Sequence, residues 1–177
     1  MEKNMNNTRK LVLTALFMAI GVVLPQAFHT IPNVGSIFLP MHIPVLVCGF
    51  ACGPLYGLAC GILTPLLSHF IFGMPPTPVL PGMLCELAVY GFMTGLLNRI
   101  IRMKNRLVKN YVVLILSMLA GRITYGILNA LVFKAGSYSM AAWTSAAFIT
   151  AIPGIIIQLL LIPILVDRLY KANLIQE

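Results

Sequence analysis

The chain consists almost entirely of long apolar stretches that show no strand-like alternation. Breaks made by proline, glycine and charged residues divide it into six predicted helices, at about 11–28, 38–53, 55–72, 79–98, 110–133 and 144–168. A helix needs roughly 20 apolar residues to cross the hydrocarbon core of a bilayer. Because unpaired backbone groups are costly in lipid and these stretches do not alternate as barrel strands do, we expect an all-α integral membrane bundle of six transmembrane helices.

Composition supports a membrane protein without a soluble domain. Of the 177 residues, 59% are hydrophobic and only 9% are charged, and the mean hydropathy of +0.94 is outside the range of soluble domains. We therefore expect a single membrane domain over residues 1–177, with residues 1–10 as a cytoplasmic tail. The first apolar stretch is expected to be a retained span, because no small-x-small cleavage site follows it.

The distribution of basic residues predicts the orientation in the membrane. With the N-terminus in the cytoplasm, most basic residues fall on the cytoplasmic side, as the positive-inside rule requires. They are Lys3, Arg9, Lys10, Arg99, Arg102, Lys104, Arg106, Lys109, Arg168 and Lys171, and only Lys134 is left for the outer loops. Five or seven spans would place a basic cluster outside, so both termini are predicted to be cytoplasmic. The net charge of +8 then reflects topology and inner-leaflet lipids, and we expect no nucleic-acid partner.

Two charged residues lie inside predicted spans and indicate a binding site. Glu86 falls in the fourth helix and Arg122 in the fifth, and ionisable groups at such depth usually serve a function. Further polar side chains are expected near these two charges, because they share a helix face with one of them or lie at the predicted outer ends of the spans. The predicted substrate-binding residues are Glu86, Arg122, His42, Tyr90, Tyr125, Asn129 and His69, with Gln158 as a further candidate. One alternative is that Glu86 and Arg122 only form an ion pair that stabilises the bundle. Another is that each histidine, including His29, only extends its polar end to the membrane–water interface.

Catalytic and metal-binding patterns are missing from the sequence. There is no HExxH, no GxSxG and no GxxxxGK[ST] motif, and of the four acidic residues only Glu86 lies deep in a span, so paired-carboxylate catalysis is excluded. The cysteines have no metal-ligand or disulfide spacing and are predicted to be free thiols; they are Cys48, Cys52, Cys60 and Cys85. We therefore predict no catalytic residue, no metal, no cofactor and no ATP hydrolysis by this chain.

Two small-xxx-small pairs indicate close helix contacts. Ala15 and Ala19 lie in the first predicted helix, and Gly57 and Gly61 lie in the third. Such pairs allow another helix to approach closely. That helix can belong to a partner protein or to the same bundle, and the sequence leaves both open.

A family resemblance is carried by the AxxxA of the first helix, the run LPMHIPVLVCGFACGPLYGLACGILTPLLSHFIFGMPP, and the segments CELAVYGF and AGRITYG. Through these segments the chain resembles the S components of energy-coupling factor (ECF) vitamin transporters. The resemblance covers essentially the whole chain. It implies a non-enzymatic, high-affinity vitamin-binding subunit in a bacterial plasma membrane, with a pocket near the outer face. It also implies that Ala15 and Ala19 meet a separate transmembrane T component driven by two cytoplasmic ATPases, and that the subunit topples to deliver its substrate.

The mixed donors and acceptors of the predicted pocket favour a small hydroxylated heteroaromatic such as pyridoxine or hydroxymethylpyrimidine, with pantothenate as the close alternative. An autonomous secondary transporter is the alternative function, although such carriers usually contain internal repeats and none is visible here. An intramembrane enzyme is the third hypothesis.

Overall fold

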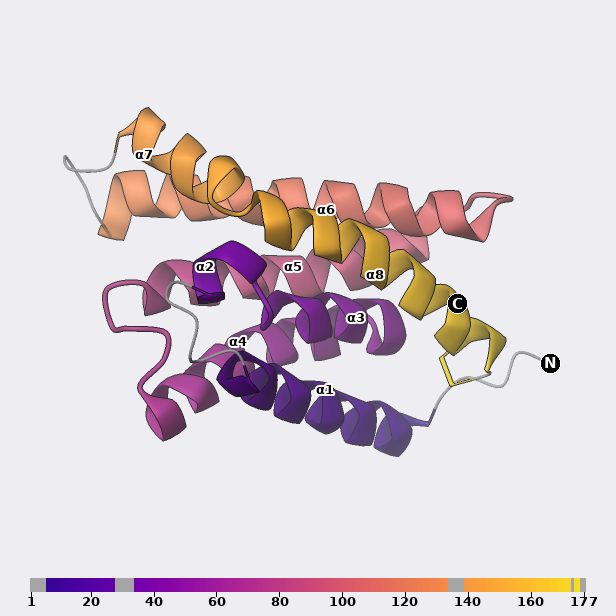
Figure 1. The fold of residues 1–177 in the computed structure, drawn as a ribbon. Coiled ribbons are helices and arrows are strands. Elements are labelled where there is room, and N and C mark those ends of the chain that lie inside the picture. Colours follow the sequence, from indigo (N-terminus) through magenta and orange to yellow (C-terminus); the bar gives the residue numbers. More distant parts are fainter. Residues whose placement is uncertain (1–5, 28–33, 134–138, 173, 176–177) are drawn as a thin grey trace.

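The structure is a computed structural model that describes residues 6–27, 34–133, 139–172 and 174–175, and all regular elements in these ranges are helical. The long helices are α1 (Asn7–Ala27), α4 (Pro54–Phe72), α5 (Leu80–Ile100), α6 (Arg106–Leu128) and α8 (Ile152–Lys171) (Figure 1). The shorter elements are α2 (Val34–Phe38), α3 (His42–Cys52), α7 (Met140–Thr144) and two π-helical turns, η1 (Asn129–Phe133) after α6 and η2 (Ser145–Ile149) before α8. Within the described ranges, five helices are long and apolar enough to span a membrane, and α3 is a shorter apolar helix. The predicted all-α membrane bundle is confirmed.

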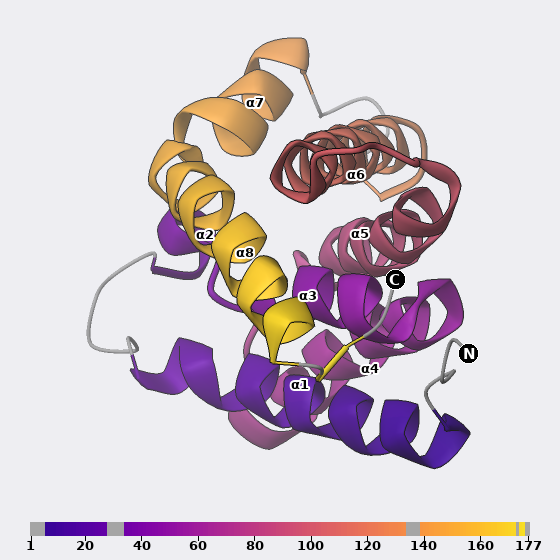
Figure 2. The same ribbon diagram turned by 90° about the vertical axis from the view of Figure 1, so that its right-hand side faces the viewer.

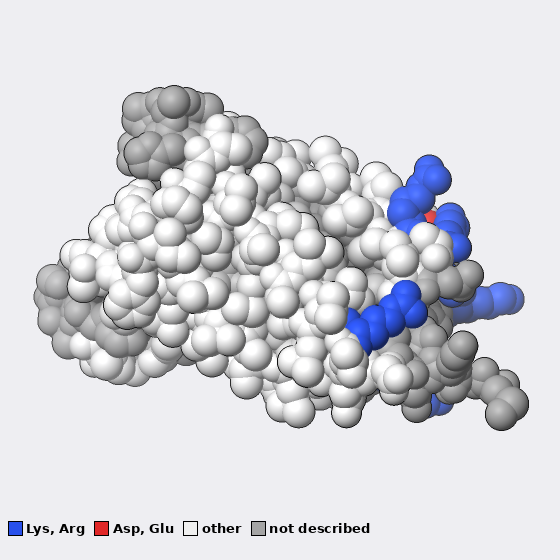
Figure 3. Space-filling model, turned by 90° about the horizontal axis from the view of Figure 1, so that it is seen from below, with Lys and Arg blue, Asp and Glu red and all other residues white. Residues whose placement is uncertain are grey.

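Basic side chains gather at one end of the molecule. Figure 3 shows Lys and Arg at the end where Figure 1 places the beginning of α1 and the end of α8. At this end the guanidinium of Arg106 lies 5.1 Å from the ring centre of Tyr170, which brings the inner ends of α6 and α8 together. By the positive-inside rule this is the cytoplasmic end. Lys134, the basic residue assigned to an outer loop, lies outside the described residues.

The second predicted helix, 38–53, begins later in the structure: α3 covers residues 42–52, and of the predicted range only Phe38 lies in the preceding short helix, α2. Leu39 has a φ of 51°, which non-glycine residues rarely adopt, and the next residue is Pro40, which disfavours helix at the residue before it. α3 has 11 residues and is about 16 Å long, so it cannot cross the bilayer by itself. The chain nevertheless reaches the inner side before α4 begins, because Gly53 lies against the guanidinium of Arg99 at the inner end of α5.

The short helix α3 lies in the middle of the bundle. It packs against α1, α4, α5 and α8, and Figure 2 shows it enclosed among these helices. Every residue of α3 except Ile43 is buried. Since other helices shield it from lipid, a broken crossing is tolerated at this position. The break places His42 at the first turn of a helix that begins inside the bundle.

α4 and α5 approach closely because glycines line their contact. A side chain at Gly57 would collide with the backbone carbonyl of Gly91, and one at Gly61 would collide with that of Leu87. The Gly57 and Gly61 pair is therefore used for packing inside this chain.

Candidate functional site

Four polar side chains from three helices meet inside the outer half of the bundle. Glu86 and Tyr90 lie on α5, Arg122 on α6 and His42 at the start of α3. All four are at least 95% buried. Glu86 lies roughly 9 Å along α5 from its outer end, so the group is at membrane depth, where an ionised side chain requires specific partners.

Glu86 is the centre of this group. Its Oε1 lies 3.1 Å from Nη1 of Arg122 and accepts a hydrogen bond of 3.1 Å from the Tyr90 hydroxyl. Its Oε2 lies 3.9 Å from Nε2 of His42, which is beyond hydrogen-bond distance. The predicted meeting of Glu86 and Arg122 is therefore what the structure contains, and Tyr90 shares the carboxylate as the helical spacing suggested.

The start of helix α3 also favours a negative charge at Glu86. α3 begins at His42 beside Glu86, and the first turn of a helix carries a partial positive charge from its unpaired N–H groups. The imidazole of His42 also stands edge-on to the Tyr90 ring, with the ring centres 5.5 Å apart. The helix end, the guanidinium and the imidazole thus surround one carboxylate with positive or neutral donors.

Several polar atoms in this region are buried and have no hydrogen-bond partner among the described residues. They are Nδ1 and Nε2 of His42, Nε and Nη2 of Arg122, and both amide atoms of Gln158. Leaving such an atom unpaired costs about 1 to 3 kcal/mol, and more for a charged group. A cluster of unpaired donors and acceptors is therefore expected where a polar ligand supplies the missing partners.

Gln158 lies about one helical turn further toward the inner side than Arg122. The inner ends of α6 and α8 meet at Arg106 and Tyr170, and from there Gln158 is roughly 18 Å and Arg122 roughly 24 Å toward the outer side. Gln158 is fully buried, on a helix that packs against α3 and α6. It belongs to the same interior, as its polarity in an apolar helix suggested.

Tyr125 and Asn129 continue the Arg122 face of α6 toward the outer side. Both lie against α5 at Gly82, where a side chain would collide with the Tyr125 ring and the Asn129 amide. The Asn129 amide donates a hydrogen bond of 2.8 Å to the Tyr125 carbonyl. These residues are thus next to the Glu86 group, and part of their role is to close the α5 and α6 contact above it.

His69 is used differently from the other predicted residues. Its Nδ1 is 2.7 Å from the carbonyl oxygen of Pro75, and since a carbonyl only accepts, Nδ1 carries the hydrogen and donates it. This bond joins the outer end of α4 to the loop before α5. His69 therefore holds the loop before α5, whereas His29 lies outside the described residues.

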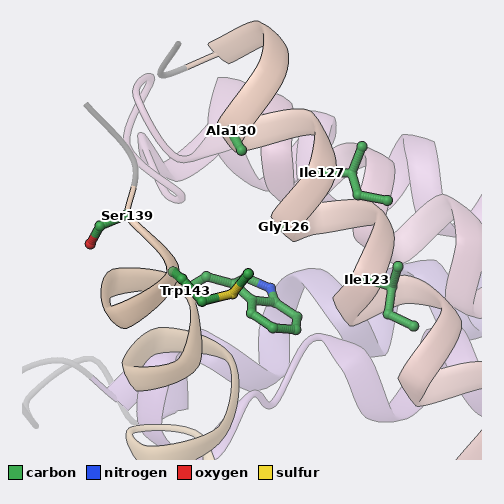
Figure 4. Close-up of a pocket in the computed structure, with 7 residues that line it drawn as sticks. Ile123, Gly126, Ile127, Ala130, Ser139 and Trp143 are labelled. Carbon is green, nitrogen blue, oxygen red and sulfur yellow. The ribbon is translucent and has the colours of Figure 1, made fainter. Parts of the chain in front are cut away.

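Trp143 was not predicted as a site residue, although it lies beside the group. Its indole N–H donates to the carbonyl of Arg122 at 3.1 Å, and its ring covers Gly126. Figure 4 shows Trp143 pointing from α7 toward Gly126 on α6, next to a pocket of about 270 Å³. That pocket is bordered by exposed apolar residues such as Ile127, at 51%, and Met140, at 74%. It therefore opens on the lipid-facing flank of α6, separate from Glu86.

On α1, the alanine pair is on the outside of the bundle. Ala15 and Ala19 are exposed, and the exposed Leu11, Leu16 and Ile20 surround them. This is the opposite of the Gly57 and Gly61 pair. All four cysteines are free, as predicted, and among the described residues no three His, Cys, Asp or Glu side chains form a metal-binding group.

Comparison with known proteins gives a family. Residues 9–166 match the family model described as the ECF transporter, substrate-specific component. No curated protein and no solved structure matches the chain. The family match covers most of the chain, including every helix that contributes to the Glu86 group. The chain therefore belongs to the substrate-specific components of ECF transporters and is a multi-pass plasma membrane transport protein, not an enzyme.

Proposed function

We propose that this component binds a small water-soluble vitamin or vitamin precursor between α3, α5, α6 and α8, at the Glu86 group. The observation that carries the proposal is the set of unpaired, buried polar atoms on His42 and Arg122 beside a single carboxylate. The buried, unpaired amide of Gln158 lies on α8, which packs against α3 and α6. A purely structural ion pair would be expected to satisfy its own donors, because unpaired atoms in a low-dielectric interior are costly. A solute with several hydrogen-bonding groups supplies the missing partners.

The chemistry of these groups is compatible with the two vitamin types suggested by the sequence. Pyridoxine or hydroxymethylpyrimidine would offer a ring nitrogen and hydroxymethyl groups to the imidazole and the Gln158 amide. Pantothenate would offer a carboxylate to Arg122.

In this family, the energy for uptake comes from other subunits. Membership of the family therefore implies that the chain associates with a T component and ATPases. We propose the exposed Ala15 and Ala19 surface of α1 as the contact with the T component. Its small side chains permit close approach, and the adjoining Leu11, Leu16 and Ile20 form an apolar face.

Native mass spectrometry of the purified protein in lipid nanodiscs tests the proposal. We expect one small polar molecule bound at a ratio of one per chain, released on denaturation and identified by its mass. Isothermal titration with that molecule should give a single high-affinity site. A protein that carries no small molecule and binds none of the water-soluble vitamins would contradict the proposal.

A further inference from the structure

In the part of the chain that the structure describes, the guanidinium of Arg122 is paired through a single nitrogen, Nη1. Nη1 pairs with Glu86 at 3.1 Å, while Nε and Nη2 are buried and have no hydrogen-bond partner among the described residues. In the planar guanidinium, the N–H of Nε and one N–H of Nη2 point in parallel from the same edge. Two parallel donors at this spacing match the two oxygens of a carboxylate.

No other strongly basic group competes for this role. Between Lys10 and Arg99 the sequence contains no Lys or Arg, and Arg122 is the one such residue between Lys109 and Lys134. Neutral amides near the inner end, Asn98 and Asn110, also carry unpaired atoms. Arg122 differs because its unpaired donors are charged, so the cost of leaving them without an acceptor is larger.

Charge balance limits the ligand to one negative charge. Arg122 and Glu86 together are neutral, so a bound carboxylate would add one negative charge to a buried site. The first turn of α3 provides a partial positive charge there, and the His42 imidazole can offer a hydrogen bond. A dianion such as a phosphate ester would exceed this capacity and would remain unbalanced in a low-dielectric interior.

From this geometry we infer that the substrate is a small monocarboxylic acid whose carboxylate lies against the Nε and Nη2 edge of Arg122. The inference rests on the proposed function, and it reverses the order of the two vitamin types suggested by the sequence. The remainder of the acid then lies toward His42 and Gln158, where hydroxyl or amide groups find donors and acceptors. An uncharged heteroaromatic ligand would leave the Arg122 edge unpaired.

Two matched pairs of probes test the charge of the ligand. Pantothenate and panthenol share a skeleton and differ in a carboxylate against a hydroxymethyl group, and nicotinate and nicotinamide differ in a carboxylate against an amide. Titration of the purified protein should show that the carboxylate binds at least about tenfold more tightly within a pair that binds at all, as the loss of a charge-assisted hydrogen bond predicts. Equal or tighter binding of the uncharged member would overturn the inference and leave the proposed site intact.

The variant Arg122→Lys separates recognition from folding, because lysine keeps the charge beside Glu86 but lacks the two parallel donors. We expect the preference for the carboxylate within a pair to fall by about tenfold or more, with the uncharged member bound as in the parent. Equal weakening of both members would instead assign Arg122 a structural role. The matched control Lys171→Ala, at an exposed ion pair with Asp167, should change neither.

If neither pair binds, the molecule that accompanies the purified protein decides the question. A co-purified carboxylic acid supports the inference, and a co-purified molecule without a carboxylate overturns it. The absence of any bound molecule, together with no binding of the other vitamins, contradicts the proposed function itself.

Discussion

At the scale of single residues, Glu86 connects the three helices that form the candidate site. Its carboxylate is contacted by Arg122 and Tyr90 and faces His42, so each of these residues depends on the others for its electrostatic environment. Groups coupled in this way do not contribute additively to stability or binding. Variants must therefore be judged by binding and stability together.

Replacing Glu86 by Gln or Arg122 by Ala should weaken binding of the co-purified ligand. The loss of a charge-assisted hydrogen bond costs about 1.5 to 3 kcal/mol, which is about tenfold or more in affinity. Titration calorimetry measures this, with Lys171→Ala as an exposed control. Normal affinity combined with a lower melting temperature in both variants would mean that the ion pair is structural and that the site is wrong.

Gln158 offers a sharper separation of binding from stability. Its amide is fully buried and unpaired among the described residues, so Gln158→Leu, which has a similar volume, should leave the melting temperature unchanged or raise it. Ligand affinity should fall by about threefold to tenfold, the effect of one neutral hydrogen bond. Thermal unfolding and titration on the same preparation would show both. A destabilised variant with unchanged affinity would remove Gln158 from the site.

At the scale of the elements, the two small-xxx-small pairs have opposite surroundings. Gly57 and Gly61 on α4 lie against the backbone of α5, whereas Ala15 and Ala19 on α1 are exposed. The same sequence pattern therefore serves internal packing in one helix and leaves a free surface in another. The difference depends on which way each helix is turned in the bundle.

Substituting leucine at both Ala15 and Ala19 should leave folding and ligand binding intact, because no side chain of the bundle covers them. Uptake by cells that contain the whole transporter should collapse, because the bulky side chains hold the partner helix away. The control is Gly61→Leu, whose side chain meets the Leu87 carbonyl. Overpacking of this kind costs about 1 to 3 kcal/mol or more and should reduce binding and uptake together. Normal uptake with the leucine pair would exclude the docking role.

At the scale of the whole molecule, the two ends of the bundle differ in their basic side chains and in the position of the first turn of α3. The inner end carries the basic side chains (Figures 1 and 3). The outer half holds the Glu86 group beside the first turn of α3. This places the candidate site on the side from which an imported solute arrives. The orientation of the chain is therefore part of the functional proposal.

Labelling of single introduced cysteines checks this orientation. Thr77→Cys lies in the exposed loop between α4 and α5, and Lys104→Cys lies between α5 and α6. A membrane-impermeant maleimide applied to intact cells should label position 77 and should label position 104 only after the cells are opened. The parent protein serves as the control, since three of its cysteines are buried within helices. Labelling of position 104 in intact cells would reverse the topology.

The local sequence determined the helical fold and the identity of the main charged residues of the candidate site. The length of each apolar stretch predicts a helix, because lipid leaves the backbone no other partner, and α4 and α5 begin within one residue of the predicted starts at 55 and 79. Helical spacing alone placed Tyr90 beside Glu86. The depth of Glu86 and Arg122 in their helices predicted one shared polar site and left open whether the two only pair with each other; the structure places them 3.1 Å apart.

Tertiary structure decided what depends on helix rotation and on contacts between distant segments. It interrupted the chain at Leu39 and Pro40 so that the second predicted helix begins only at His42, and it enclosed α3 so that a short helix is stable inside the bundle. It turned the alanine pair outward and the glycine pair inward. It also determined which nitrogen of Arg122 meets Glu86 and which edge stays unpaired, since that depends on the relative positions of α5 and α6. The hydrophobic pattern of the sequence does not predict which edge of the Arg122 guanidinium stays unpaired. It indicates which helix faces are apolar, but not how two polar side chains on different helices meet.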